Sequence, residues 1–178
     1  MDNKVEEILK SAEIMVREGG YNAFSFREIA KIVGIKSSSV HYHFPTKSDL
    51  GAAVAKHYTN NFLDHLGVPK QHIESGKNPI EFYVQTFKNA LINDKRVCLC
   101  GILGAEINSL PSEVKNEIKI FFERNIEWLI ESYTLIDIKG DLHKKALQTL
   151  SLLEGAMIMS NVFGDINYFD AATSEVTL

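Results

Sequence analysis

Residues 25–50 read SFREIAKIVGIKSSSVHYHFPTKSDL, and this stretch decides the fold. Ser25 is a good helix N-cap, and Glu28 stands three residues later, where it completes a capping box. Apolar residues then recur at helical spacing up to Gly34, a residue that suits the positive φ of a tight turn. A second short helix follows over 37–43. The stretch therefore predicts two short helices joined by a turn.

The spacing of small and apolar residues within this stretch is that of a helix-turn-helix. Ile29 faces the core of the unit, Ala30 stands where the two helices cross closely, and Gly34 lies in the turn. Val40 and Phe44 hold the second helix against the first. An Ala and a Gly four residues apart occur by chance in many helices. The joint pattern behind a capped first helix is far more specific, and it favours DNA binding.

Helical periodicity continues along the rest of the chain, and no segment has the pattern of a strand, so the sequence predicts an all-α fold. The segment 67–78 has no periodicity and is predicted to be a connecting loop, and the residues from Gly164 onward are predicted to be weakly structured. The expected helices cover about 5–18, 26–33, 37–43, 46–66, 79–91, 111–133 and 141–163.

The composition of the chain excludes several classes of protein. Its 178 residues are 45% apolar, which is enough for a sizeable core. There is no run of about 18 apolar residues, as a membrane helix requires, and the acidic N-terminus does not resemble a secretion signal. Cys98 and Cys100 are too close in sequence to bridge without strain. We therefore expect reduced thiols and a cytoplasmic protein without membrane contact.

The charge of the chain is unevenly distributed. The net charge is −4, which by itself argues against a nucleic-acid partner. The segment 25–47 nevertheless holds four basic residues against one acidic residue, a local charge of +3. These residues are Arg27, Lys31, Lys36, Lys47 and Glu28. A basic unit beside an acidic remainder is typical of a small DNA-binding head on a larger body.

The segment 25–50 resembles the N-terminal domain of the tetracycline-repressor (TetR) family of transcriptional regulators. The family has a Ser or Thr cap, an Ile-Ala pair, Gly-Val or Gly-Ile in the turn, a hydrophobic-Tyr-x-His/Tyr-Phe run, and a Lys three residues after the Phe. The corresponding residues are Ser25, Ile29, Ala30, Gly34, Ile35, Val40, His41, Tyr42, His43, Phe44 and Lys47. The match covers roughly residues 5 to 55. His41 departs from the pattern, because a Tyr is most usual at this position.

The resemblance implies a three-helix helix-turn-helix head over residues 1–50, and a helical-bundle domain for ligand binding and dimerisation over 51–178. It also implies a homodimer on a near-palindromic operator in double-stranded DNA, because two recognition helices must reach successive major grooves about 34–36 Å apart. Repression is the usual mode of the family. The resemblance further implies that a small-molecule effector bound by the C-terminal helices releases the DNA, and it implies no cofactor.

The resemblance also assigns candidate DNA contacts. The N-terminal half of the second helix would approach the base edges, so Lys36, Ser38, Ser39 and His41 are the base-reading candidates. A lysine can donate to guanine acceptors, and serines are short and permissive. Without the motif, the two serines would simply be a solvated helix surface.

A second group of residues corresponds to positions that contact phosphates. Tyr42 and His43 are placed like the phosphate contacts of the family. Ser25 and Lys47 stand near helix starts, where free N–H groups help to bind the DNA backbone. Arg27 is a further candidate in the first turn of its helix. For Lys47 the alternative is an ordinary surface charge.

The two long helices near the C-terminus are apolar on more than one side. A helix with two apolar sides must be covered on both, so these helices are candidates for the protomer core and for contact with a second chain. Gly155 lies within the run SLLEGAMIM and costs about 1 kcal/mol of helix stability relative to Ala. Close approach of a helix across a dimer would offset this cost, and a tolerated glycine in the protomer core is the alternative.

Large apolar side chains of the C-terminal part are candidates for a ligand pocket, although a bundle core needs the same residues. Glu106 and Glu154 stand in apolar runs, where a carboxylate could anchor a cationic or hydroxylated ligand, cap a neighbouring helix or pair with a lysine. The candidate pocket residues are Phe62, Tyr83, Phe87, Leu103, Glu106, Trp128 and Met157.

Other chemistry has weaker support in the sequence. Cys98 and Cys100 are candidates for a thiol sensor, because basic residues lie just upstream and would favour a thiolate, but small core residues are the alternative. His41 and His43 would point about 200° apart on a helix and could not chelate one metal ion. No catalytic or metal motif is found, so we expect neither an enzyme nor a metal site. A partner-binding module whose helix-turn-helix has lost DNA binding is the second alternative.

Overall fold

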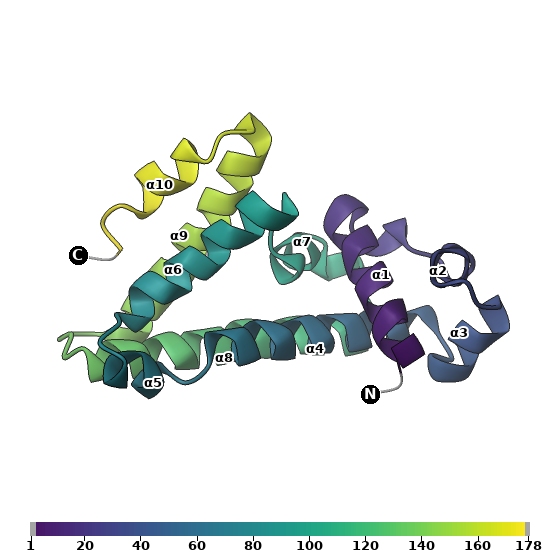
Figure 1. The fold of residues 1–178 in the computed structure, drawn as a ribbon, viewed down its shortest axis with the longest axis horizontal. Coiled ribbons are helices and arrows are strands. Elements are labelled where there is room, and N and C mark those ends of the chain that lie inside the picture. The colour runs from purple at the N-terminus through teal and green to yellow at the C-terminus, as the bar shows by residue number, and fades with distance from the viewer. Residues whose placement is uncertain (1–2, 177–178) are drawn as a thin grey trace. The chain divides into compact units, whose positions relative to one another are not determined.

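The computed structural model describes residues 3–176, and every regular element in this range is a helix (Figure 1). The all-α prediction is therefore confirmed. The α-helices are α1 (Asn3–Gly19), α2 (Phe26–Val33), α3 (Ser37–His43), α4 (Lys47–Leu66), α5 (Pro69–Glu74), α6 (Pro79–Asn89), α7 (Leu99–Ala105), α8 (Ser112–Leu135), α9 (Leu142–Phe163) and α10 (Asn167–Thr173). Two 3-10 turns, η1 (Tyr21–Ala23) and η3 (Ile107–Ser109), and one π-helical turn, η2 (Ala90–Asp94), connect them. Over the described range, none of the helices combines the length and the apolar character that crossing a membrane requires.

The chain divides into two compact units, each built from two separate segments. Unit 1 comprises Met1–Asn61 and Leu99–Phe121, and unit 2 comprises Phe62–Cys98 and Phe122–Leu178. The segments alternate along the chain, whereas the predicted domains, 1–50 and 51–178, are consecutive. That division of function between head and body stays a prediction.

The core of unit 1 is assembled from the apolar faces of its short helices. Val40 is completely buried and Phe44 is 9% exposed, as expected for residues that hold α3 in place. The buried residues of α1 and α2 recur at helical spacing, so each of these helices presents one continuous apolar stripe. They are Ile8, Leu9, Ala12, Val16, Phe26, Ile29, Ala30 and Val33.

The helix α4 begins with a capping box formed by Thr46 and Asp49. The Thr46 backbone N–H donates to Asp49 Oδ2 at 3.0 Å, and the Asp49 N–H donates to Thr46 Oγ1 at 3.1 Å. Two backbone donors at the helix start are thereby satisfied, which stabilises the first turn of α4.

Unit 2 is organised around the long helix α9. The helix α6 starts with Pro79 in its first turn, and Asn78 Oδ1 accepts the Ile80 N–H at 2.9 Å. In Figure 1, α6 runs beside α9, and α10 folds back along α9. The N-cap of α9 is Asp141, whose carboxylate accepts the Lys144 N–H at 2.9 Å.

Two helices lie where the sequence predicted irregular structure. The helix α5 occupies part of the predicted loop 67–78, and α10 occupies part of the segment predicted to be weakly structured. Both predictions were wrong because helices of six and seven residues are too short to display a periodic apolar face. The helix α10 is held by tertiary contacts: Phe169 is fully buried, and Asp170 pairs with Lys88 at 2.6 Å.

Candidate nucleic-acid interface

The helices α2 and α3 are joined by the predicted turn. Ser25 Oγ accepts the Glu28 N–H at 3.3 Å and donates to the Glu28 carboxylate at 2.7 Å, so the α2 cap is confirmed. At the other end, Gly34 has φ +71° and its N–H bonds to the Ala30 carbonyl oxygen. The Ile35 N–H reaches the same carbonyl oxygen at 3.0 Å. This left-handed turn redirects the chain into α3.

The side of α3 that faces away from the core is polar. Ser38 and Tyr42 each stand two residues from the buried Val40, about 200° around the helix, so they lie nearly opposite it. Tyr42 is 83% exposed. Lys36, the N-cap residue of α3, is also exposed. Ser39 is half-buried on the flank of the helix. The outward face thus presents hydroxyl, phenol and ammonium groups to solvent.

The two histidines of α3 have different surroundings. The His41 ring packs edge-on against Phe26, with 4.4 Å between ring centroids, and its Nδ1 lies 3.4 Å from the Pro45 carbonyl oxygen. His43 is half-buried, and its ring lies 5.2 Å from that of Tyr42. Residues 3–176 contain no group of three or more His, Cys, Asp or Glu side chains that could hold a metal ion. The contact with Phe26 places the His41 ring on the side of α3 that faces α2.

Lys47 lies in the first turn of α4 against two aromatic rings. Its Nζ is 5.0 Å from the centre of the Tyr21 ring and 4.7 Å from that of Phe24. Partial burial lowers the pKa of Lys47, and the nearby Glu28 carboxylate opposes this shift. The ammonium group is therefore held by cation–π contacts at the edge of the head rather than extended freely into solvent.

The remaining predicted DNA contacts lie on α2. Arg27 is exposed in its first turn. Ser25 is half-buried and its hydroxyl is already bonded to Glu28, so a phosphate contact by this hydroxyl would have to share or replace that bond. All nine predicted DNA-contacting residues therefore lie in unit 1, within or directly before the helices α2 and α3 or at the start of α4. These residues are Ser25, Arg27, Lys36, Ser38, Ser39, His41, Tyr42, His43 and Lys47.

Four of the predicted ligand-pocket residues meet in an aromatic cluster of unit 2. Tyr83 stacks on Trp128 at 5.2 Å between ring centroids, and Phe87 and Phe62 lie 5.3 Å and 6.1 Å from the Tyr83 ring. The Tyr83 hydroxyl donates to Asn125 Oδ1 at 2.7 Å, and burial raises the pKa of this phenol well above its ordinary value. No local pattern in the sequence indicates Asn125, because this residue lies 42 positions from its partner.

The three other predicted pocket residues are distributed over both units. Leu103 belongs to unit 1, and Met157 is buried in α9. Glu106, also in unit 1, accepts the Tyr21 backbone N–H at 3.0 Å. Capping of a neighbouring helix was one of the alternatives that the sequence left open for this carboxylate, and Glu106 accepts the first N–H of the 3-10 helix η1.

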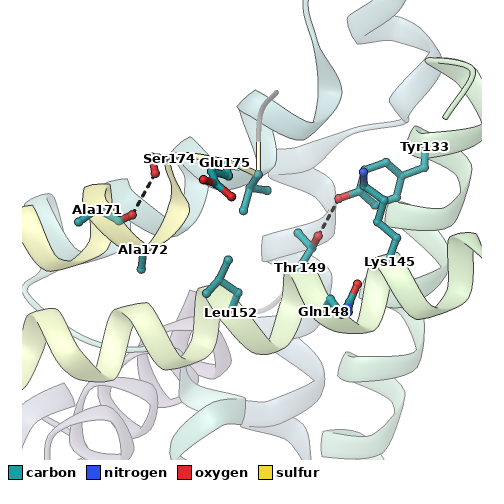
Figure 2. A pocket seen from close by; sticks show the side chains of 10 residues that line it. Tyr133, Lys145, Gln148, Thr149, Leu152, Ala171, Ala172, Ser174 and Glu175 are labelled. Carbon is teal, nitrogen blue, oxygen red and sulfur yellow. Dashed lines mark hydrogen bonds between the residues drawn. The ribbon is translucent and has the colours of Figure 1, made fainter.

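A cavity of about 440 Å³ opens between α9 and the C-terminal residues 171–176 (Figure 2). At one end, the Tyr133 hydroxyl and Thr149 Oγ1 form a hydrogen bond of 2.7 Å, and Lys145 Nζ lies 5.3 Å from the centre of the Tyr133 ring. Burial raises the pKa of Tyr133, and the hydrogen bond with Thr149 opposes the shift. Leu152 contributes an apolar wall.

Glu154 is an ionisable group on the inner side of α9. Burial raises the pKa of its carboxyl group from 4.5 to about 7, and a hydrogen bond with Cys98 opposes this shift. Its Oε1 atom is buried and has no hydrogen-bond partner among the described residues. Cys98 and Cys100 are both buried, at 2% and 0% exposure. This burial agrees with the alternative that both cysteines are small core residues, because a reactive thiolate requires solvent access, and a thiol-sensor role stays a prediction.

The outer side of α9 is apolar and exposed. Ile158 is 53% and Val162 is 70% exposed, and Met159 belongs to the same face. Gly155 lies at its centre and is itself exposed, with nothing within 4 Å of the position of an added Cβ. The alternative of a glycine in the protomer core is therefore wrong. The three- and four-residue spacing of these side chains was the signal in the sequence for this second apolar face.

A capped helix, a glycine turn and a second helix with an exposed polar face define a helix-turn-helix protein. Residues 8–54 match the family model described as bacterial regulatory proteins, tetR family. A crystal structure of a TetR transcriptional regulator from Legionella pneumophila is 32% identical, with a TM-score of 0.87 over 99% of this chain and 96% of that one. A TetR-family regulator from Agrobacterium tumefaciens is 26% identical, with a TM-score of 0.78 over 96% and 94% of the two chains.

Among curated proteins, the chain is 25% identical over 114 residues to IcaR of Staphylococcus epidermidis, an HTH-type negative transcriptional regulator of the biofilm operon icaADBC. The aligned region spans 64% of this chain and 58% of IcaR. Together with the full-length similarity to the Legionella regulator, these matches identify the family. The chain belongs to the tetR family of bacterial transcriptional regulators.

Proposed function

We propose that this protein is a cytoplasmic repressor that binds a near-palindromic DNA operator as a homodimer and is released by a small-molecule effector. The observation that carries DNA binding is the outward face of α3, where the exposed Lys36, Ser38 and Tyr42 stand opposite the buried Val40. A helix with this arrangement can enter the major groove while its apolar side remains attached to the head.

In this proposal the polar residues of the head divide into two groups. Lys36, Ser38, Ser39 and His41 read base edges, and Lys36 is the strongest candidate because an ammonium donates well to guanine acceptors. The second group binds phosphates and sets the position of α3 in the groove. It comprises Ser25, Arg27, Tyr42, His43 and Lys47.

The proposed dimer forms through the outer face of α9. An exposed stripe of Ile158, Met159 and Val162 is unfavourable in water, and a second copy of the same chain offers a matching apolar stripe. Gly155 at the centre of this face would allow two helices to approach closely. A dimer also meets the requirement of a palindromic operator for two recognition helices.

The proposed effector binds within the domain 51–178. Support comes from the aromatic cluster around Tyr83 and Trp128, from the partly buried Glu154 carboxyl group, and from the cavity beside Tyr133. An effector would release DNA only if it bound one arrangement of the dimer more tightly than the other.

Selection of bound DNA from a random pool tests the proposal. The purified protein is expected to enrich one near-palindromic site with half-sites about one helical turn apart. The matched control is a Tyr42→Ala, Lys36→Ala double variant, which retains the core of the head but lacks two exposed α3 side chains. Equal recovery of random DNA by both proteins, with no enriched site, would contradict specific DNA binding.

A further inference from the structure

The corner between α1 and η1 is fixed by a carboxylate that is distant in sequence. Glu106 Oε2 accepts the Tyr21 N–H at 3.0 Å, across 85 residues of chain. The preceding residue, Gly20, has φ +78°, and a Cβ at this position would collide with the Glu106 carboxylate. The close approach therefore requires glycine for two reasons, its backbone conformation and its lack of a side chain.

The Tyr21 side chain at this corner is confined on several sides. Tyr21 is 7% exposed, and its ring packs edge-on against Phe24 with 5.6 Å between ring centroids. A Cβ on Gly51 of α4 would lie 2.6 Å from Tyr21 Cε2 and 3.1 Å from a methyl carbon of Val114. The absence of a side chain at Gly51 thus makes room for the ring. Once the Tyr21 backbone is fixed, its ring has little freedom to move.

The outer surface of this aromatic pair carries the Lys47 ammonium group. Lys47 Nζ lies 5.0 Å from the centre of the Tyr21 ring and 4.7 Å from that of Phe24. A lysine side chain normally samples many rotamers, and ordering it on binding a phosphate reduces affinity. A lysine that is already held over two rings loses less conformational entropy when DNA binds.

We propose that Glu106 is a positioning residue for DNA binding, which fixes through Tyr21 the aromatic surface that holds Lys47 ready for a phosphate. The proposal rests on the proposed function, because it assumes that Lys47 contacts operator DNA. Glu106 itself touches no DNA in this scheme. Its negative charge would even weaken DNA binding through repulsion, so its contribution to affinity is structural preorganisation and not electrostatic attraction.

A double-mutant cycle tests this link. Operator affinity is measured at one salt concentration for the wild type, Glu106→Ala, Lys47→Met and the double variant, with the site recovered by random-pool selection as the probe. Glu106→Ala is expected to weaken binding about 3- to 10-fold when Lys47 is present, and by less than about twofold in the Lys47→Met background. A purely structural loss would reduce affinity equally in both backgrounds and would overturn the proposal.

Glu106→Gln is the matched control, because it removes the charge but keeps an oxygen that can accept the Tyr21 N–H. It is expected to bind the operator at least as well as the wild type, and a loss as large as that of Glu106→Ala would also overturn the proposal. If thermal melting shows that Glu106→Ala does not fold, Tyr21→Leu takes its place in the double-mutant cycle. The loss of operator affinity is again compared between the Lys47 and Lys47→Met backgrounds. Failure of the wild type to bind any DNA would instead refute the proposed function.

Discussion

The helices α3 and α9 both bury one side and expose the other, but their exposed sides have opposite chemistry. On α3, the face opposite Val40 carries Ser38 and Tyr42. On α9, the exposed face carries Ile158 and Val162. A polar exposed face suits a hydrated, charged partner such as DNA, whereas an apolar one is stable only when another apolar surface covers it. The exposed side of a helix is therefore more informative about its partner than the buried side.

The largest expected effect tests the apolar face of α9. Ile158→Glu would place an unpaired charge in the proposed dimer interface, so dimerisation is expected to weaken by about 3 kcal/mol or more, roughly 100-fold. Analytical ultracentrifugation measures the association. Ile73→Glu, at an exposed isoleucine on α5, is the matched control and is expected to leave the dimer intact. If Ile158→Glu still forms a dimer of wild-type affinity, the α9 face is not the interface.

The buried side of α9 is expected to make the stability of the protein dependent on pH. The pKa of Glu154 is raised to about 7 in the folded protein, so the folded state binds more protons than the unfolded state at intermediate pH. The free energy of unfolding therefore falls as pH rises from about 5 to about 8, by an amount on the order of 2 kcal/mol.

Urea unfolding of the wild type and of Glu154→Gln at several pH values measures this dependence. Glutamine does not titrate, so the variant is expected to have a flatter profile over the same range. Parallel profiles for the two proteins would show that the Glu154 carboxyl group titrates normally.

The polar face of α3 is tested by Tyr42→Ala. Loss of this exposed phenol is expected to weaken operator binding about 10-fold for all operator sequences, because phosphate contacts carry little sequence information. Gel shifts at one salt concentration measure the change. Tyr168→Ala, at an exposed tyrosine on α10, is the control. Wild-type affinity of Tyr42→Ala would remove Tyr42 from the interface.

If α3 reads base edges, substitutions on its polar face should change which operator sequence the protein prefers, in addition to weakening its affinity for DNA. For Lys36→Ala and His41→Ala, the free-energy difference between the preferred base and the other bases is expected to fall by about 1–3 kcal/mol at particular operator positions. Random-pool selection with each variant gives the preferred bases. Because His41 packs against Phe26, its variant also tests whether this ring reads DNA at all. An unchanged preferred site would assign His41 to the packing of α2 against α3.

The smallest expected effects come from a pair of glycines. Gly34→Ala places a side chain in a left-handed turn, where nothing lies within 4 Å, and is expected to cost about 1 kcal/mol of stability through the backbone alone. Gly155→Ala lies in a helix and is expected to stabilise the isolated protomer by up to about 1 kcal/mol. The same substitution is expected to weaken the dimer if two α9 helices approach closely. Urea unfolding and ultracentrifugation together separate these contributions.

The helix-turn-helix could be predicted because its signals are local. The cap at Ser25, the turn at Gly34 and the buried Val40 each depend on residues within a few positions in the sequence. The short helices α5 and α10 could not be predicted in this way. The helix α10 depends on the burial of Phe169 and on the pairing of Asp170 with Lys88, which is 82 residues away. Neither contact has a local signal.

The sequence by itself determined the helical periodicity, the caps and the glycine turn, because backbone hydrogen bonds in helices join residues three or four positions apart. The DNA-contacting candidates that it suggests lie on the two short helices α2 and α3 and at the start of α4. Only the tertiary structure decided that Glu106 holds Tyr21, that Tyr83 bonds to Asn125, and that the face around Gly155 is exposed. These relationships depend on how helices pack, and packing joins side chains whose separation in sequence carries no information about their distance in space.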